Sequence, residues 1–300
     1  MNKSELPFLP FHRPTIYESH IEAVADTLRS GWLTSAGKVK EFEKAFAERV
    51  GAKHAVAVSS CTAALHLALL GLDIGPMDEV ITSPITFVSA VNVIEHVGAT
   101  PVFADVLPDD LTIDPKSVFS KISRRTKLII ATHFAGFPAH MDELDEISVK
   151  NGIPIVTDAA HGIEVAYHGR ESGQLGRVAC YSFYATKNIT TGEGGMFVTD
   201  DEALAEQVRS LSLHGMTAGA WTRYAPGGYK HWDVTQPGWK YNMSDVQAAL
   251  GLAQLADLDA WAGKRIMLEG AYLAYLDRKV VGTLSSADPD IRQGRHLFVV

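Results

Sequence analysis

A lysine and an aspartate stand where they could do chemistry together. Lys187 lies in the segment Ser-Phe-Tyr-Ala-Thr-Lys-Asn at residues 182–188, just ahead of the glycine-rich residues 192–195. Asp158 stands upstream, shortly after an apolar run at residues 153–156. A lysine amine can form a Schiff base with the aldehyde of pyridoxal 5'-phosphate (PLP), and a carboxylate can pair with the protonated ring nitrogen so that the ring accepts electrons. The two side chains therefore predict a PLP site with Lys187 as its catalytic residue.

A turn upstream of both residues has the composition of a phosphate site. Residues 59–62 (Ser-Ser-Cys-Thr) separate an expected strand at 55–58 from an expected helix at 63–70. Such a turn directs free backbone N–H groups and the positive end of the helix toward an anion. An ordinary helix N-cap is the alternative interpretation. The lysine and the aspartate downstream favour the phosphate site.

Three further side chains could contact the cofactor. Phe87 follows an expected strand at 79–82 and could stack on a flat ring, or it could belong to the core. Ser182 could donate its hydroxyl to the cofactor phosphate. His161 could hold Asp158, contact the cofactor, or serve only the structure.

The aspartate and the lysine also have structural alternatives. Asp158 could cap a helix, although an ion pair with a pyridinium needs a carboxylate held in a dry pocket. Lys187 could be a solvated surface residue, but it lies between an apolar strand and a glycine-rich turn. The pKa of a lysine falls readily on burial, which leaves a free amine for proton transfer.

Short apolar runs alternate with helical stretches along the first two thirds of the chain. Because these runs are apolar on both faces, they predict a largely parallel sheet covered by helices on both sides. The expected strands are residues 55–58, 79–82, 101–104, 128–131, 153–157, 179–184 and 196–199, and expected helices include 63–70, 88–97 and 142–150.

The last third departs from this rhythm. Residues 215–239 are rich in glycine, proline and aromatics, which indicates a long functional loop. Helical stretches follow at about 244–259 and 262–279, and an apolar run at 297–300 predicts a strand. A chain that ends inside a strand leaves a sheet unfinished, so we expect a fragment or a truncated gene product.

Composition limits the possible partners. The formal net charge is -8 and there is no block of basic residues, which disfavours a nucleic-acid partner. Neither a signal-peptide core nor an apolar run of membrane-spanning length is present. Cys61 and Cys180 lack the spacing of a disulfide framework or a zinc site, so we expect no metal and a reducing, cytoplasmic environment.

The motifs, in this order, resemble the DegT/StrS-type (DegT/DnrJ/EryC/StrS) family of PLP-dependent sugar aminotransferases from Pro14 to the end of the chain. The nearest likeness within the family is to enzymes that aminate UDP-4-keto-arabinose. The motifs that carry the resemblance are Ser-Gly-Trp-Leu-Thr at 30–34, Ser-Ser-Cys-Thr-Ala at 59–63, Asp-Glu-Val-Ile-Thr at 78–82, Asp-Ala-Ala-His at 158–161, Ser-Phe at 182–183, Lys-Asn-Ile-Thr at 187–190 and Gly-Trp-Lys-Tyr-Asn-Met at 238–243.

The resemblance implies a role for each matching residue. Lys187 is the Schiff-base lysine, Asp158 pairs with the pyridine nitrogen, and His161 lies beside it. Cys61 and Thr62 bind the cofactor phosphate, helped by Ser182, and Phe87 stacks on the ring. Asn242 reaches the phosphate of the cofactor bound by the neighbouring subunit. The expected active unit is therefore a homodimer with shared sites. An amide that merely caps the helix near Ser244 is the structural alternative for Asn242.

The resemblance also implies the fold and the reaction. It predicts a fold-type-I α/β transferase, with a large PLP-binding domain and N-terminal arm at 1–240 and the start of a small C-terminal α+β domain at 241–300. Family members continue beyond residues 296–300, so the small lobe is expected to be incomplete. The predicted reaction moves an amino group from glutamate to a nucleotide-linked ketosugar for polysaccharide or related amino-sugar synthesis. The nucleotide, the sugar and the aminated carbon stay open.

Two alternatives have different consequences. A PLP-dependent sugar dehydratase of the same family would carry histidine in place of Lys187, so the lysine disfavours that reaction. A truncated, non-catalytic paralogue that keeps the fold and the cofactor is favoured by the abrupt end at Val300 and disfavoured by the intact set of motifs.

Overall fold

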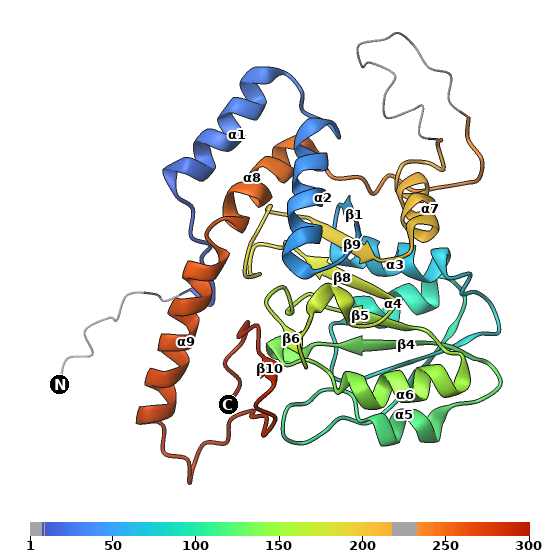
Figure 1. Ribbon diagram of the computed structural model, residues 1–300, viewed down its shortest axis with the longest axis vertical. Helices are drawn as coiled ribbons and strands as arrows, with labels where there is room; N and C mark the ends of the chain where they lie inside the picture. The colour runs from blue at the N-terminus through green and yellow to red at the C-terminus, as the bar shows by residue number, and fades with distance from the viewer. Residues whose placement is uncertain (1–7, 9, 218–232) are drawn as a thin grey trace.

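A seven-stranded sheet forms the centre of the protein (Figure 1). The computed structural model describes residues 8, 10–217 and 233–300. The strands of the central sheet are β1 (His54–Val58), β2 (Glu79–Thr82), β3 (Thr100–Phe103), β4 (Thr126–Thr132), β5 (Ile155–Asp158), β8 (Val178–Ser182) and β9 (Gly195–Thr199). Their order is β1-β9-β8-β5-β4-β2-β3. The strands from β8 to β3 run parallel to one another, whereas β9 runs antiparallel to both of its neighbours.

Helices cover both faces of this sheet, as the apolar composition of the strands requires. The helices are α1 (Glu18–Ser30), α2 (Gly37–Val50), α3 (Cys61–Gly71), α4 (Val88–His96), α5 (Pro115–Lys121), α6 (Met141–Asn151), α7 (Glu202–Ser212), α8 (Asp245–Leu255) and α9 (Leu258–Tyr275). Side chains of a strand alternate between the two faces. On one face they pack against α3, α4 and α7. On the other face they pack against α2, α8 and α9 near β1, β8 and β9, and against α5 and α6 near β2, β4 and β5.

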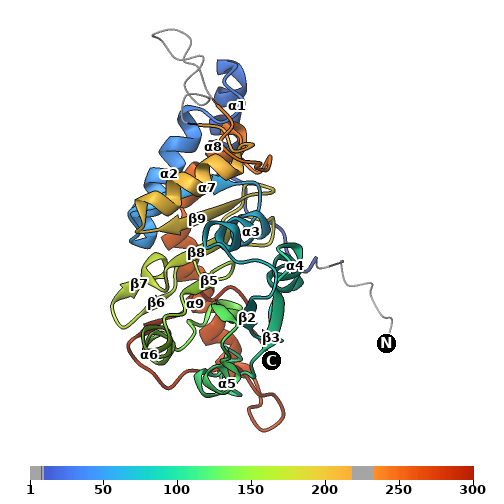
Figure 2. The same cartoon turned by 90° about the vertical axis from the view of Figure 1, so that its right-hand side faces the viewer.

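Figure 2 shows this layering from the side, with α3 and α4 on one side of the strands and α6 on the other. Each expected strand of the sheet is present, with ends that differ by at most two residues. The predicted parallel character is confirmed for the strands from β8 to β3. The antiparallel direction of β9 has no signature in a short apolar run.

The structure contains a second, three-stranded sheet that the sequence did not predict. Its strands are β6 (Ala166–Tyr167), β7 (Arg170–Glu171) and β10 (Ile291–Arg292), and all its pairings are antiparallel. Strands of two residues are too short to show a period of two. The sheet is formed by segments far apart in sequence, since β10 pairs with β6 across more than a hundred residues.

The strand predicted at 297–300 is wrong. These residues have no regular structure, and no described strand pairs with them. Instead the chain docks on the 3₁₀ turn η1 (Phe134–Gly136): the amides of His296 and Leu297 donate to the Ala135 carbonyl at 3.1 and 3.2 Å. A Cβ on Gly136, whose φ is +99°, would lie 2.7 Å from the Arg295 nitrogen, so this close approach requires glycine.

The helical stretches predicted after residue 243 are confirmed as α8 and α9, with the break between them at residues 256–257. Most of the loop predicted at 215–239 falls on residues 218–232, outside the described part of the chain. On either side of that segment, Met216 and Val234 form an antiparallel bridge. Within the described residues, no helix combines the length and hydropathy needed to cross a membrane.

Candidate active site

The carboxyl ends of the parallel strands meet at one edge of the sheet, where ligands of open α/β sheets bind. The strand registers align the predicted site residues along this edge. Asp158 at the end of β5 lies beside Thr132 of β4 and Cys180 of β8. One strand further, Gly195 of β9 pairs with Ser182 on one side and with Val58 on the other. The fold therefore brings together the turn after β1, the aspartate after β5 and the segment after β8.

Asp158 is a buried carboxyl with few partners. Only 3% of the residue is exposed. Its Oδ1 accepts a hydrogen bond from the Ala160 amide at 3.1 Å and one from the Cys61 thiol at 3.7 Å. Burial raises its pKa, and the Ala160 amide and the charge of Lys187 oppose that rise. No helix follows Asp158, so its interpretation as a helix cap is wrong.

Lys187 lies in a turn that follows β8, and its amide donates to the Tyr184 carbonyl at 2.9 Å. The residue is half-buried. Burial lowers the pKa of its amine, while the charge of Asp158 acts in the opposite direction. No described carboxylate forms an ion pair with the amine. The side chain is therefore a partly desolvated amine, and the interpretation as a solvated surface lysine is wrong.

The N-cap interpretation of the turn after β1 is confirmed, whereas the phosphate site stays a prediction. Ser60 caps α3, because its hydroxyl accepts from the Ala63 amide at 3.0 Å. The amides of Cys61 and Thr62 belong to the first turn of the helix and have no acceptor inside it. These N–H groups remain available for an anion at the positive end of α3.

A glycine keeps this turn close to the neighbouring strand. A Cβ on Gly195 would lie 2.3 Å from the carbonyl carbon of Ser60 and 2.6 Å from the Cys61 nitrogen. Any larger residue would push the turn away from β9. Gly195 also faces Ser182 across the ladder, and the Ser182 hydroxyl accepts from the Tyr184 amide at 3.3 Å, which leaves its own proton free to donate.

The thiol of Cys61 is directed to Asp158 rather than to the anion position. Burial raises the pKa of Cys61 well above its usual value, and the charge of Asp158 acts in the same direction. The thiol therefore stays protonated and donates toward the carboxylate. Only the backbone of Cys61 remains to hold an anion.

Phe87 is an exposed aromatic at the same edge of the sheet. It precedes α4, beyond the end of β2, and 72% of it is exposed. The interpretation as a core phenylalanine is therefore wrong. An aromatic ring exposed at this position is available to stack on a planar ligand.

His161 lies next to Asp158 in sequence and packs against a histidine that the sequence did not single out. Its ring stacks on that of His296, with 4.3 Å between centroids and an interplanar angle of 26°. The Ala135 amide donates to His161 Nδ1 at 3.3 Å, so in the neutral ring Nε2 carries the proton. Burial and the charge of Lys187 lower the pKa of His161 to about 3.

His296 is held by the residue that follows the lysine. Its Nδ1 lies 2.9 Å from Asn188 Oδ1, and the Asn188 amide in turn donates to Glu164 at 2.6 Å. Glu164 pairs with Arg265 of α9. No local pattern predicts that these side chains meet, because they come from four separate segments.

His133 is a second site residue that sequence reasoning missed. It follows β4, it is fully buried, and its amide donates to the Asp158 carbonyl at 3.0 Å. Its Nδ1 accepts from the Ala139 amide at 3.1 Å, whereas Nε2 has no hydrogen-bond partner among the described residues. Burial lowers its pKa to about 4. Its one available signal is its position at the end of a predicted strand.

Asn242 lies beside the strand that leads into the phosphate turn. It forms an isolated bridge with Val58, and its Nδ2 donates to the Ser35 hydroxyl at 2.6 Å. The side chain does not cap α8, because Ser244 is the N-cap and shares a capping box with Gln247. The interpretation of Asn242 as a helix cap is therefore wrong. No hydrogen bond joins it to Lys187 within the described chain.

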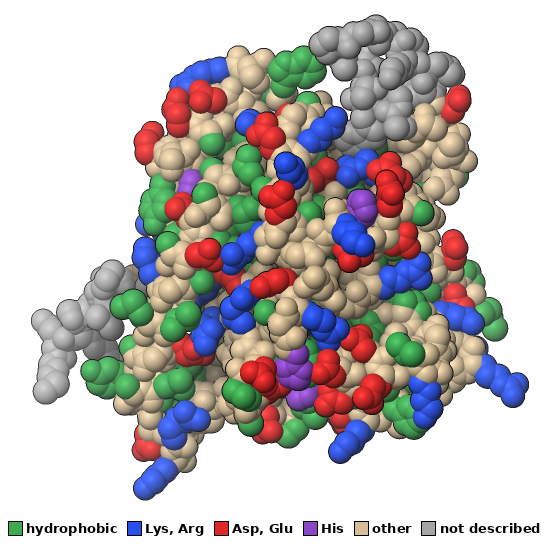
Figure 3. Space-filling model, viewed as in Figure 1, with side chains coloured by type: hydrophobic (Ala, Val, Ile, Leu, Met, Phe, Trp, Pro, Cys, Tyr) green, Lys and Arg blue, Asp and Glu red, His purple; other side chains and the backbone are tan. Residues whose placement is uncertain are grey.

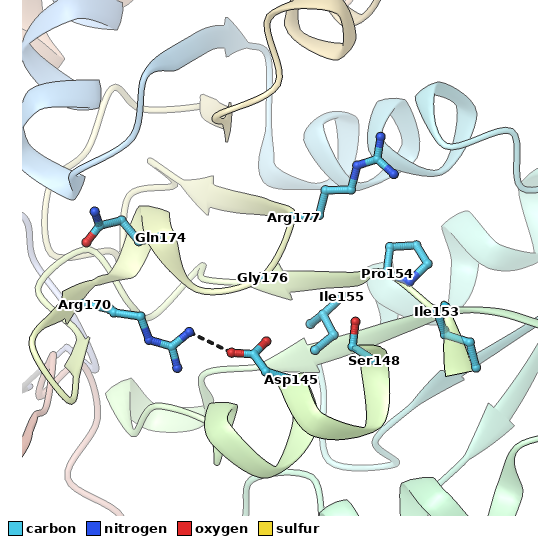
Figure 4. Close-up of a pocket in the computed structure, with 10 residues that line it drawn as sticks. Asp145, Ser148, Ile153, Pro154, Ile155, Arg170, Gln174, Gly176 and Arg177 are labelled. Atoms are coloured by element: carbon cyan, nitrogen blue, oxygen red, sulfur yellow. Dashed lines mark hydrogen bonds and ion pairs between the residues drawn. The ribbon is translucent and has the colours of Figure 1, made fainter. Parts of the chain in front are cut away.

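A cavity of ≈360 Å³ lies beside the Lys187 segment. Its walls come from residues 12–15, the segment that follows β8, and α9. A cavity of equal volume lies at the opposite, amino-terminal end of β5 (Figure 4). Its arginines are already engaged, since Arg170 pairs with Asp145 at 2.7 Å and Arg177 with Asp201 at 3.1 Å. The side chains without ion-pair partners described above, Asp158 and Lys187, therefore lie at the carboxyl ends of the strands and not at this second cavity.

The sequence and the fold match known proteins over almost the whole chain. The model of the DegT/DnrJ/EryC1/StrS aminotransferase family matches residues 14–300. The chain is 48% identical over 294 residues to the spore coat polysaccharide biosynthesis protein SpsC of Bacillus subtilis (strain 168), which covers 98% of this chain and 75% of SpsC.

Solved structures show the same relationship. The putative sugar aminotransferase Spr1654 from Streptococcus pneumoniae, in its PMP-form, superposes with a TM-score of 0.91 at 34% identity, over 97% of this chain and 78% of that one. Its PLP-form matches with a TM-score of 0.87. DesV from S. venezuelae matches with a TM-score of 0.84 at 36% identity, over 93% of this chain and 72% of that one.

Proposed function

Because the chain belongs to the DegT/DnrJ/EryC1/StrS aminotransferase family and is a PLP-dependent sugar aminotransferase, we propose that it moves the amino group of glutamate to a nucleotide-linked ketosugar. The products are 2-oxoglutarate and an amino sugar for polysaccharide synthesis. The name of SpsC, a spore coat polysaccharide biosynthesis protein, supports the biosynthetic context. The observation that carries the proposal is the partly desolvated amine of Lys187 beside the buried carboxyl of Asp158.

The residues at the carboxyl edge fit PLP in chemistry and position. A phosphate fits the free N–H groups of Cys61 and Thr62 at the start of α3 and the hydroxyl of Ser182, with Gly195 leaving room for the turn. A protonated ring nitrogen fits Asp158, because a cation beside a buried carboxyl offsets the pKa rise that burial causes. When bound, PLP supplies the aldehyde carbon that carries the amino group and a ring that accepts electrons from the substrate carbon.

Lys187 is the proposed acid and base. Its Nζ takes a proton from the α-carbon of glutamate and later returns one to the sugar carbon that receives the amine. The lowered pKa favours the first step, because a larger fraction of the amine is then deprotonated and able to accept the proton. Asp158 holds its negative charge toward the ring nitrogen throughout.

His161 and Phe87 are proposed to position the ring. With its Nδ1 occupied by the Ala135 amide, His161 presents a protonated Nε2 that can donate. Phe87 offers an exposed aromatic face at the end of β2. His133, buried behind the end of β4, fixes the backbone of Asp158.

The proposed active unit is a homodimer in which Asn242 reaches the neighbouring subunit's phosphate. Exposed apolar side chains on α9 support association, among them Met267 with 76% and Tyr272 with 54% exposed. Figure 3 shows hydrophobic side chains along the left edge of the molecule, where α9 lies in Figure 1. We propose that residues 1–240 form the cofactor domain and that 241–300 begin the smaller one.

Mixed dimers test the shared site. Combining a Lys187→Ala chain with an Asn242→Ala chain places both changes in one site and leaves the other intact. We expect one site of full cofactor affinity per mixed dimer. In the Asn242→Ala homodimer we expect cofactor affinity to fall by about one to two decades, because each site loses a hydrogen bond to a charged group. Two impaired sites in the mixed dimer would show that Asn242 acts within its own chain.

Absorbance tests the reaction itself. Protein purified with PLP should be yellow, and glutamate should shift the absorbance while 2-oxoglutarate accumulates in equal amount. A panel of UDP- and dTDP-linked 4-ketosugars should then restore the original spectrum for the true substrate class. A spectrum that glutamate leaves unchanged, in protein that has bound PLP, would contradict the proposed donor.

A further inference from the structure

The cavity beside the Lys187 segment is lined by positive charge. Three cationic side chains lie on its walls, Arg13, Lys264 and Arg265, together with Lys187 and the histidines His12 and His296. Among the described residues that line it, none is acidic. The protein as a whole carries a formal charge of -8, so this accumulation of cations runs against the overall composition.

Helix α9 presents one face to the cavity. Trp261, Lys264, Arg265 and Leu268 are spaced three and four residues apart, which places them on the same side of a helix. The apolar Trp261 and Leu268 stand at the two ends of this row and the cations stand between them. The row therefore combines apolar contacts with charge, as a site for an organic anion requires.

Two of these cations lack a counter-ion. Within the described part of the chain, Arg13 and Lys264 form no ion pair and no side-chain hydrogen bond. Arg265 pairs with Glu164 through its Nη2. However, its Nε is buried and no described residue accepts from it. A buried N–H without an acceptor costs free energy, which a bound anion would recover.

An adjacent cavity shows that cations without ion-pair partners are not a general feature of the surroundings of Arg265. A space of ≈160 Å³ on another side of Arg265 is lined by four arginines and two acidic residues. Its arginines have carboxylate partners: Arg49 pairs with Asp259 at 2.6 Å and Arg295 with Glu269 at 2.6 Å. Each arginine of that cavity has a carboxylate partner, whereas Arg13 and Lys264 beside Lys187 have none within the described part of the chain.

We propose that the cavity between residues 12–15, the Lys187 segment and α9 is an anion subsite, in which Arg13, Lys264 and Arg265 hold the charged end of a substrate. A volume of ≈360 Å³ lies within the range of small-molecule sites. The ligand chemistry is that of a compact dianion, from either of two sources: the carboxylates of the amino donor or the diphosphate of the sugar nucleotide. This inference rests on the proposed function, because it assigns a substrate to the same site.

Equilibrium titration of the PLP-loaded chain tests the subsite with two probes, glutarate for a dicarboxylate and UDP for a nucleoside diphosphate. We expect at least one probe to bind, with affinity falling about tenfold or more in Arg13→Gln and in Lys264→Gln, as for loss of a charged hydrogen bond. Matched controls are Arg49→Gln in the neighbouring cavity and Lys44→Gln on α2, which should change affinity less than about twofold, as is usual for charges outside the site.

The pattern of losses identifies the source of the anion. A loss for glutarate alone assigns the donor carboxylates, a loss for UDP alone assigns the sugar nucleotide, and competition between the probes assigns both. The subsite is refuted if neither probe binds, or if Arg13→Gln and Lys264→Gln bind both probes as the controls do. Thermal unfolding of each variant checks that the fold is intact.

Failure of the subsite can be separated from failure of the proposed function. Borohydride reduction followed by mass spectrometry reports whether PLP is attached at Lys187, independently of either probe. If PLP is attached at Lys187 but Arg13→Gln and Lys264→Gln bind the probes as the wild type does, the subsite alone is refuted. Absence of attachment contradicts the cofactor role of Lys187, and the anion titration of cofactor-free protein then still decides the subsite.

Discussion

The two ends of the central sheet hold ionisable groups in opposite ways. At the amino-terminal end of β5, the charges around the cavity in Figure 4 are paired and partly solvated: Arg170 contacts both Asp142 and Asp145. At the carboxyl end, Asp158 and Lys187 are desolvated and form no ion pair with each other. Burial raises the pKa of Asp158 and lowers that of Lys187, so in both cases it favours the neutral side chain.

This difference distinguishes charges that are paired near solvent, such as Arg170, from Asp158 and Lys187, which are desolvated without an ion-pair partner among the described residues. Removing a charge from water without a partner costs several times more than a surface pair contributes. An ion pair near solvent is close to neutral for stability. The carboxyl edge therefore lowers the stability of the cofactor-free protein, and a bound cationic ring and phosphate would offset that cost.

The largest expected effect is at Lys187. Lys187→Ala should abolish covalent attachment of PLP altogether, because no other amine occupies the position after β8. Borohydride reduction and peptide mass mapping should find the cofactor on Lys187 in the wild type and on no residue in the variant. Lys44→Ala, on the exposed side of α2, is the control and should leave attachment unchanged. Trapping at one other lysine would refute the assignment.

The next largest effect is at Asp158. Asp158→Asn keeps the shape and removes the charge, so proton removal from glutamate should slow by several kcal/mol of barrier, with each ~1.4 kcal/mol a factor of ten. Single-turnover absorbance with glutamate measures this step. Cys61→Ala removes only the 3.7 Å thiol contact to the carboxylate and should cost far less. Rates near wild type in Asp158→Asn would exclude its role at the ring nitrogen.

An intermediate effect is expected in the pH dependence of stability. The pKa of His133 falls from 6.5 to about 4 on burial. A lowered histidine pKa means that its stabilising contribution is complete above pH 6.5 and is lost as pH falls toward 4. The full loss from this group is on the order of 3 kcal/mol. Denaturant unfolding of cofactor-free protein between pH 7.5 and 4.5 measures it.

Two variants separate this histidine from the others. His133→Gln keeps an acceptor for the Ala139 amide and should flatten the loss of stability on acidification. His168 is the opposite case, because its ring N–H groups donate to the carboxylates of Asp288 and Asp142, which raises its pKa. His168→Gln should therefore remove a contribution that is present below pH 6.5 and lost above it. Equal slopes for wild type and His133→Gln would show that burial does not lower the pKa of His133 in the folded state.

The sheet and much of the candidate site could be predicted from the sequence because both depend on short, local patterns of residues. A strand buried on both faces is a continuous apolar run, and the carboxyl end of each run marks the edge where Asp158, Lys187 and Phe87 lie. The family and its cofactor, predicted from the same motifs, are confirmed by the match over residues 14–300 and by the solved relatives.

The residues that were missed depend on contacts between distant segments. His296 reaches the site only because residues 294–297 dock on η1, far away in sequence. The same docking explains the wrong strand at 297–300: an apolar run forms a strand only where a partner edge is available. His133 carries no motif, and its burial follows from packing of the whole edge.

The smallest expected effect is at the paired end of the sheet. Arg170→Gln removes contacts to Asp142 and Asp145, both partly exposed, so unfolding free energy should fall by only ~0–1 kcal/mol. Cofactor affinity and the response to glutamate should not change, because the cavity in Figure 4 lies at the amino-terminal end of β5, whereas Lys187 follows the carboxyl end of β8. Thermal unfolding and PLP titration of the same preparation measure both quantities. A loss of cofactor affinity in Arg170→Gln would mean that the two ends of the sheet are coupled, and that pairing at one end helps to hold the desolvated groups at the other.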